Sequence, residues 1–232
     1  MAAELFSSEV EALLPKQTTP YITDLETLAL GKRHGLATAT YINPRDPARV
    51  ERKCDFIFLQ GSPPLEPVGT LMPNVYRDED GTWCTILVRQ FRPNYQGDTI
   101  EFPAGFIERN AGETAEGAAV REMEEETTKT GTVLATSPNL TAEPVPVGAR
   151  LVGVLLHAVD KTGDEAGKQR LDKGEFAVEY KVPLLNLEGR LDDFEMAGIV
   201  IDPRVWTFAM GIRCALMLEL HEAAKGVDVD TP

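Results

Sequence analysis

The sequence predicts an α+β protein, in which a mixed β-sheet is flanked by helices and preceded by a small β-rich region. Two observations carry this prediction. Short apolar runs bounded by glycine, proline and aspartate indicate strands throughout the chain, and helix-start signals follow strands in its second half. The 232 residues suit one large domain with an appendage. We expect an N-terminal β-rich region at 1–66, the main domain at 67–224 and a C-terminal tail at 225–232.

Turn signals set the limits of the expected strands. In the N-terminal region, strands at 36–42 and 56–59 are separated by a Pro-Arg-Asp-Pro turn, and Asp78-Glu79-Asp80-Gly81 predicts a hairpin turn in the main domain. Phe176, Val178, Tyr180 and Val182 alternate along the last strand, so we expect them to be buried and Glu179 to face solvent. The strands expected in the main domain are 71–76, 82–90, 99–102, 151–159 and 176–182.

Three segments carry helix signals. Thr114 is a suitable N-cap for a helix that reaches about Thr128, with Gly131 as its stop. A short helix is expected within 183–194. Asp202-Pro203 then predicts the start of a last helix to about Ala224, because proline is favoured at the first helical position.

Charge and cysteine content restrict the partners and the compartment. The net charge of −14 disfavours unspecific binding to nucleic acid or to anionic membranes. The longest aliphatic stretch, 151–159, is too short to span a bilayer, and the N-terminus has no basic, apolar leader. The three cysteines lie far apart with no Cys-x-x-Cys spacing. We therefore expect a cytoplasmic protein with no nucleic-acid or membrane partner.

An acidic helix is the most informative segment. Residues 113–126 contain six glutamates and one cation, Arg121. On a helical wheel, Glu122, Glu125 and Glu126 share one stripe, which a helix would avoid without a compensating charge. Ala119, Val120 and Met123 share the apolar face, and Arg121 lies one turn before Glu125. Such a stripe is typical of a Mg²⁺ site, because this ion prefers oxygen ligands; the alternative is a solvated acidic surface.

The residues around this helix resemble a known motif. Gly105-x7-Glu113-x7-Arg121-Glu122-Met123-x-Glu125-Glu126 is similar to the Nudix box, G-x5-E-x7-R-E-U-x-E-E-x-G-U, where U is aliphatic. The chain departs from it by two extra residues within 108–111, which a loop should absorb, and by Thr128 and Lys129 in place of Gly-U. Flanking segments resemble the ADP-ribose pyrophosphatase subgroup: Gln90-Phe91-Arg92-Pro93, Glu101-Phe102-Pro103-Ala104-Gly105, Gly174-Glu175-Phe176 and Asp202-Pro203-Arg204-Val205-Trp206.

The resemblance implies an α/β/α sandwich and a set of site residues. Mg²⁺, with Mn²⁺ as the alternative, would bind the carboxylates of Glu122, Glu125 and Glu126 and the carbonyl of Ala104. Arg121 would orient Glu125, and Glu113 would steady the junction of loop and helix. The remaining implied residues are Glu175 as a further catalytic glutamate, and Arg92, Phe106 and Glu143 as substrate contacts.

The implied reaction is hydrolysis of ADP-ribose or a similar ADP-sugar to AMP and a sugar phosphate, by a homodimer. Relatives stack the adenine between aromatic rings, but the N-terminal region has no tryptophan. Tyr21 and Tyr41 are the candidates to take the place of tryptophan in this stacking. Two alternatives follow from these departures. One is a Nudix hydrolase for NADH, another nucleotide sugar or a dinucleoside polyphosphate, and the other is a catalytically weak nucleotide sensor.

Overall fold

The computed structural model describes residues 20–60, 66–142, 147–171 and 176–225. The chain divides into two compact units. The first comprises Met1–Glu66 together with Thr141–Arg150, and the second comprises Pro67–Leu140 and Leu151–Pro232. Each unit has its own β-sheet, so the N-terminal β-rich region expected from the sequence is present.

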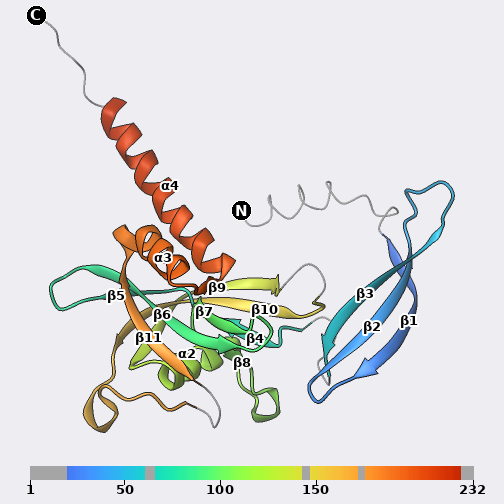
Figure 1. Cartoon of the computed structure of the whole chain (residues 1–232), viewed down its shortest axis with the longest axis horizontal. Coiled ribbons are helices and arrows are strands. Elements are labelled where there is room, and N and C mark those ends of the chain that lie inside the picture. Colours follow the sequence, from blue (N-terminus) through green and yellow to red (C-terminus); the bar gives the residue numbers. More distant parts are fainter. Residues whose placement is uncertain (1–19, 61–65, 143–146, 172–175, 226–232) are drawn as a thin grey trace, which may run out of the picture. The chain divides into compact units, whose positions relative to one another are not determined.

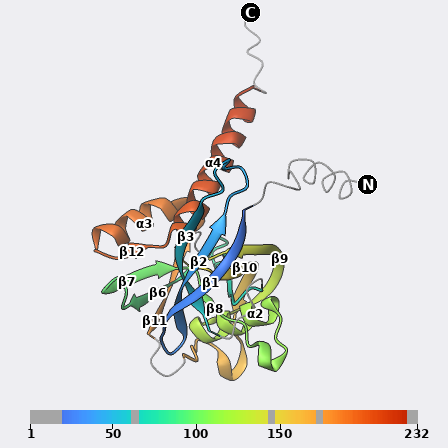
Figure 2. The same ribbon diagram turned by 90° about the vertical axis from the view of Figure 1, so that its right-hand side faces the viewer.

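The first unit contains one antiparallel sheet, β1 (Tyr21–Leu30), β2 (His34–Ile42) and β3 (Glu51–Leu59), in the order β1-β2-β3 (Figure 2). The segment Thr141–Arg150, distant in sequence, joins this sheet at β3. Val147 forms a β-bridge with Ile57, and the Gly148 N–H donates to the Ile57 carbonyl at 2.8 Å. Strand β1 has no counterpart among the expected strands. Its pairing shifts register at two places, which breaks the alternation by which strands are recognised.

The second unit is built on a mixed sheet with the strand order β12-β7-β6-β5-β10-β4-β8, while β11 also pairs with β6 and β9 with β10. Strand β10 runs parallel to β4 and β5, whereas β6 runs antiparallel to β5, β7 and β11. The strands are β4 (Gly69–Leu71), β5 (Asn74–Arg77), β6 (Trp83–Arg92), β7 (Gly97–Glu101), β8 (Ala104–Phe106), β9 (Lys129–Thr141), β10 (Arg150–Asp160), β11 (Ala177–Pro183) and β12 (Val200–Ile201).

Helices cover both faces of this sheet (Figure 1). Helix α2 (Ala115–Glu126) lies on one face, and α3 (Leu187–Met196) and α4 (Pro203–Lys225) lie on the other. Short 3₁₀ turns occur at η1 (Arg109–Ala111), η2 (Gly163–Glu165) and η3 (Leu184–Asn186). None of the helices within the described part of the chain is both long and apolar enough to span a bilayer.

Two hydrophobic clusters hold the layers together. Ile86 packs with Ala119 and Met123 of α2, whereas its neighbour Leu87 packs with Leu191 of α3. Successive strand residues point to opposite faces of a sheet, so β6 supplies both cores. The α/β/α sandwich is thereby confirmed.

Local differences from the expected elements have clear physical reasons. The strand expected at 71–76 is split into β4 and β5, because Pro73 has no N–H to donate to a ladder. The buried face expected for β11 is wrong in part: Phe176 and Val178 are exposed, and Ala177 is buried instead. Gly131 does not end α2 but lies within β9, where a Cβ would meet the Leu156 side chain at 3.0 Å.

Candidate active site

The start of α2 is built by local hydrogen bonds. The Thr114 hydroxyl accepts from the Gly117 N–H at 3.1 Å, as expected of an N-cap. The two extra residues fall where η1 forms, and the Glu113 carboxylate accepts from the Glu108 N–H at 2.7 Å across that turn. Gly112 ends η1 with φ of +73°, a conformation suited to glycine. The insertion is therefore absorbed before the helix begins.

Arg121 connects the start of α2 with its acidic stripe. Its Nε and Nη2 donate to the Glu113 carboxylate at 2.8 and 3.1 Å, and Nη2 also donates to the Phe106 carbonyl at 2.9 Å. Its Nη1 donates to Glu122 at 2.8 Å and to Glu125 at 2.9 Å. The five N–H groups of the guanidinium are thus all used. The hydrogen bonds that Arg121 donates to Glu113, and after them the hydrogen bond to Glu122, raise the pKa of Arg121.

Glu126 ends the stripe and lies against the sheet. Its side chain is buried, with Oε1 accepting from Gln90 Nε2 at 2.7 Å and Oε2 accepting from the Ala104 N–H at 3.1 Å. Burial of a carboxylate is costly unless donors compensate, and both oxygens have one here. Glu126 and Ala104, which the motif places 22 residues apart, are therefore in direct contact.

Glu122 lies against the same strand. A Cβ added to Gly105 would come within 1.9 Å of the Glu122 carboxyl carbon, so the carboxylate occupies the space that a side chain would fill. The acidic stripe therefore lies against strand β8, which brings carboxylate oxygens close to backbone carbonyls. Both are hard oxygen donors of the kind that a divalent cation takes. Within the part of the chain described, no three His, Cys, Asp or Glu side chains come close enough to enclose an ion. Glu122 and Glu125 instead share Arg121, and Glu126 faces Gln90 and Ala104.

Arg92 extends the site along β6. Its Nε and Nη2 donate to the two oxygens of the buried Glu101 carboxylate at 2.8 and 2.6 Å, and 38% of its side chain remains exposed. These hydrogen bonds to Glu101 raise the pKa of Arg92, and the Glu126 carboxylate adds to the shift from a greater distance. Gln90 and Arg92 are two residues apart in a strand and so lie on one face. Arg92 is thus placed beside the stripe, with its position fixed by Glu101.

The other predicted residues fall into two groups. Phe106 is 49% exposed on β8, next to Gly105, while Tyr21 on β1 and Tyr41 on β2 belong to the first unit. Glu143 and Glu175 lie outside the described residues.

Three groups have contacts in this geometry that the sequence did not predict for them. They are Gln90, which holds Glu126, Glu101, which holds Arg92, and Glu179. The prediction that Glu179 faces solvent is wrong, because its side chain is 16% exposed and accepts from the N–H and hydroxyl of Thr128 at 2.5 and 2.7 Å. Strand alternation places Gln90 on the face of Arg92 and could have identified it.

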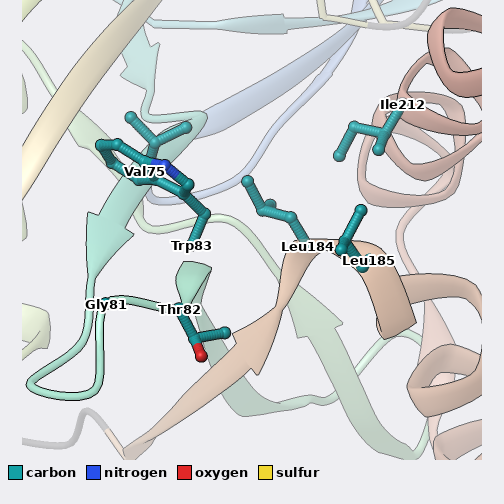
Figure 3. Close-up of a pocket in the computed structure, with 7 residues that line it drawn as sticks. All are labelled: Val75, Gly81, Thr82, Trp83, Leu184, Leu185 and Ile212. Atoms are coloured by element: carbon teal, nitrogen blue, oxygen red, sulfur yellow. The ribbon is translucent and has the colours of Figure 1, made fainter.

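A separate pocket of about 610 Å³ lies among β5, β6, η3 and α4 (Figure 3). Trp83 forms one wall, with the Arg77 guanidinium 5.5 Å from the centre of its ring, and Leu184, Leu185 and Ile212 form the other. None of the candidate metal ligands lines it.

This fold, with an acidic helix held by one arginine against a Pro-Ala-Gly strand, defines a class of protein. The NUDIX domain family matches residues 65–195, more than half of the chain, and the chain belongs to this family. It is a Nudix hydrolase.

Individual relatives agree with this assignment. The chain is 30% identical to the ADP-sugar pyrophosphatase of Mus musculus over 203 residues, which cover 84% of this chain and 88% of the mouse protein. It is 32% identical to the ADP-ribose pyrophosphatase of Saccharomyces cerevisiae over 176 residues, 74% of each chain. The crystal structure of an ADP compounds hydrolase has the same fold, with a TM-score of 0.61 and 18% identity over 89% of this chain and 98% of that one.

Proposed function

We propose that the protein is a Mg²⁺-dependent hydrolase that cuts the diphosphate of ADP-ribose or a similar ADP-sugar, giving AMP and a sugar phosphate. The observation that carries this proposal is the arrangement on α2, where Arg121 joins Glu122 to Glu125 and Glu126 contacts Ala104. Relatives named ADP-sugar pyrophosphatase and ADP-ribose pyrophosphatase support the substrate class.

The residues that would hold the metal are Glu122, Glu125, Glu126 and the carbonyl of Ala104. They fit a hard divalent cation because their donors are oxygens, and because the Glu122 carboxylate lies in the space left by Gly105. Mn²⁺ accepts the same oxygen donors. Bound in this place, the cation would neutralise phosphate charge and make a nearby water easier to deprotonate.

The surrounding side chains have separable roles in the proposal. Arg121 orients Glu122 and Glu125 and has no N–H left for a substrate. Arg92, fixed by Glu101 and partly exposed, would pair with a phosphate through its planar fork. Phe106 would contact the substrate from β8. The roles of Glu143 in substrate binding and of Glu175 in accepting a proton rest on the family resemblance alone.

We further propose a homodimer in which the first unit contributes to the dimer contact. Strand β1 is at the edge of its three-stranded sheet and exposes five large apolar side chains, and such surfaces favour association. They are Tyr21, Ile22, Leu25, Leu28 and Leu30. A cytoplasmic location is supported by the three cysteines, none of which is paired.

The test is release of AMP from ADP-ribose in the presence of Mg²⁺ by wild type, Glu122→Gln and Glu116→Gln. Loss of an outer-shell partner of a metal costs about 10–100-fold, so loss of a direct ligand should lower kcat/KM more than about 100-fold. Glu116→Gln removes the same charge from the first turn of α2, outside the stripe, and should retain activity.

Each alternative has its own outcome. Faster turnover of NADH, another nucleotide sugar or a dinucleoside polyphosphate than of ADP-ribose would overturn the substrate proposal. Calorimetric binding of ADP-ribose without AMP release at any Mg²⁺ concentration would identify a sensor instead. Equal activity of Glu122→Gln and wild type would remove Glu122 from the metal site.

A further inference from the structure

The C-terminal end of α2 needs hydrogen-bond partners that its own sequence does not provide. The last carbonyls of a helix accept no hydrogen bond from within the helix. A glycine after the last turn commonly lets the following backbone N–H groups donate to them. Here Thr127 follows α2 in an extended conformation, and the chain enters β9 at Lys129. The Thr127 N–H donates to the Met123 carbonyl at 3.1 Å. The carbonyls of the next three residues, 124–126, need donors from outside the helix.

The segment that directly follows β10 supplies one donor for each of these carbonyls. Lys161 Nζ donates to the Glu124 carbonyl at 2.9 Å, and the Arg170 N–H donates to the Glu125 carbonyl at 2.9 Å. Gln169 Nε2 donates to the Glu126 carbonyl. We call residues 161–170 the cap segment. It closes the helix in place of the expected Gly131.

The cap segment is anchored at both ends. Lys161 is only 7% exposed, and its Nζ also donates to the Lys168 carbonyl, which folds the segment back on itself. A buried ammonium is costly in isolation but favourable at the negative end of a helix. Gln169 Nε2 also donates to the Ala177 carbonyl at 3.3 Å, at the start of β11. The end of α2 is therefore tied to β11 through one side chain.

The capped carbonyls belong to residues whose side chains carry the proposed chemistry. Glu125 and Glu126 are both candidate metal ligands. Hydrogen bonds that fix their backbone also fix the Cα positions from which their side chains extend. The Glu126 carboxylate is held separately by Gln90 and Ala104, so backbone and side chain are constrained from different elements. A misplacement of about 1 Å in a catalytic site can cost 100-fold in rate.

We infer that Lys161 and Gln169 are positioning residues, which hold the end of α2 so that Glu125 and Glu126 are placed to bind a divalent cation. The inference rests on the proposed metal site, and through it on the proposed function. A purely structural role would lower thermal stability without changing affinity for the cation.

The experiment uses Mn²⁺ as the probe, because its binding to the full chain can be followed by electron paramagnetic resonance without any substrate. Lys161→Met and Gln169→Glu each remove the donor at similar side-chain length, and Lys161→Arg restores a cation. Lys168→Met is the matched control, since it removes an exposed charge from the same segment while its carbonyl stays. Unfolding temperatures and kcat with ADP-ribose and saturating Mg²⁺ are measured alongside.

We expect Lys161→Met and Gln169→Glu to raise the Kd for Mn²⁺ by about 10-fold or more, with recovery in Lys161→Arg and no change in Lys168→Met. An unchanged Kd in both folded donor variants would overturn the inference, as would a wild type that binds no Mn²⁺. If Lys161→Met does not fold, Gln169→Glu decides alone, because Gln169 is only partly buried. A raised Kd in a protein that leaves ADP-ribose intact would support the inference and overturn the proposed substrate.

Discussion

The acidic site on α2 and the pocket beside Trp83 belong to the same unit but are built in opposite ways. On α2, each carboxylate of the stripe meets a specific donor: Arg121 for Glu122 and Glu125, and Gln90 and Ala104 for Glu126. The pocket has a volume of about 610 Å³, within the range of ligand sites, and its walls are mainly apolar. Polar groups with fixed positions, more than empty volume, therefore favour the stripe on α2 over the pocket as the proposed site of chemistry.

The same difference separates the expected effects of substitution. A side chain of the stripe acts through its position, so a small steric change there should alter catalysis before it alters stability. A side chain of the pocket wall acts through contact area, so its loss should alter stability and leave catalysis unchanged.

The largest effect is expected from Gly105→Ala. The added Cβ would come within 1.9 Å of the Glu122 carboxyl carbon and 2.4 Å of its Cγ, so the carboxylate has to move. We expect kcat/KM for ADP-ribose to fall about 100-fold or more, because a displacement of about 1 Å in a catalytic group has that effect. AMP release at several Mg²⁺ concentrations measures the loss.

Gly211→Ala in α4 is the control for this substitution, since an added Cβ there meets nothing within 4 Å. It should keep wild-type activity and gain stability of up to about 1 kcal/mol, because alanine favours a helix over glycine. Wild-type kcat/KM in Gly105→Ala would show that the contact between β8 and Glu122 does not constrain the site.

The two ends of α2 explain how far the sequence could predict this site. Its start depends on neighbours in the chain: Thr114 caps Gly117 three residues later, and Arg121 reaches Glu125 four residues later. Such spacings are visible in a sequence, and both contacts were expected. The stop at Gly131 was wrong because the end of α2 depends on donors 37 to 45 residues away, at 161–170.

The strands follow the same rule. The turn at Asp78–Gly81 was predicted from its residues alone, and the Asp78 N–H indeed bonds the Thr82 carbonyl at 2.9 Å. The predicted solvent exposure of Glu179 is wrong because the hydrogen-bond partner of its side chain, Thr128, is 51 residues away in the sequence. The family pattern implied roles for Glu122, Glu126 and Ala104, whereas it included Gln90 and Glu101 in the segments similar to the subgroup without implying a role for either.

A smaller effect is expected from Trp83→Ala, which removes one wall of the pocket. Trp83 is 46% exposed, and it contacts the Arg77 guanidinium and the His157 ring, whose centre lies 6.1 Å from its own. We expect the free energy of unfolding to fall by about 1–2 kcal/mol, from lost apolar area and a lost cation–π contact. Denaturation by urea, followed by circular dichroism, measures it.

Trp83→Phe is the control, because it keeps an aromatic face for Arg77 and should recover most of the lost stability. Both variants should keep wild-type kcat and KM for ADP-ribose. A raised KM in Trp83→Ala with unchanged stability would place substrate in the pocket and break the comparison.

The smallest effect is expected at Asp160, which joins the segment after α2 to β5. Its carboxylate accepts from Lys129 Nζ at 2.7 Å and from the Tyr76 hydroxyl at 2.8 Å. The Lys129 hydrogen bond, with a further contribution from Tyr76, holds the pKa of Asp160 below its usual value. A lowered folded-state pKa stabilises the protein above the unfolded-state pKa of about 3.9, and this stabilisation is lost as the pH falls through the folded-state pKa.

Asp160→Asn tests the sign of this linkage. Because the Asp160 side chain is 59% exposed, the loss of stability at pH 7 should be below about 1 kcal/mol. The gap between wild type and variant should narrow as the pH falls below about 4, where the wild-type carboxylate also loses its charge. Thermal unfolding of both proteins between pH 7 and pH 3 measures it. If the stability difference between the two proteins widens towards acid, the hydrogen bonds to the neutral form matter more than the ion pair with Lys129. Unchanged AMP release by Asp160→Asn at pH 7 would show that Asp160 acts independently of the stripe on α2.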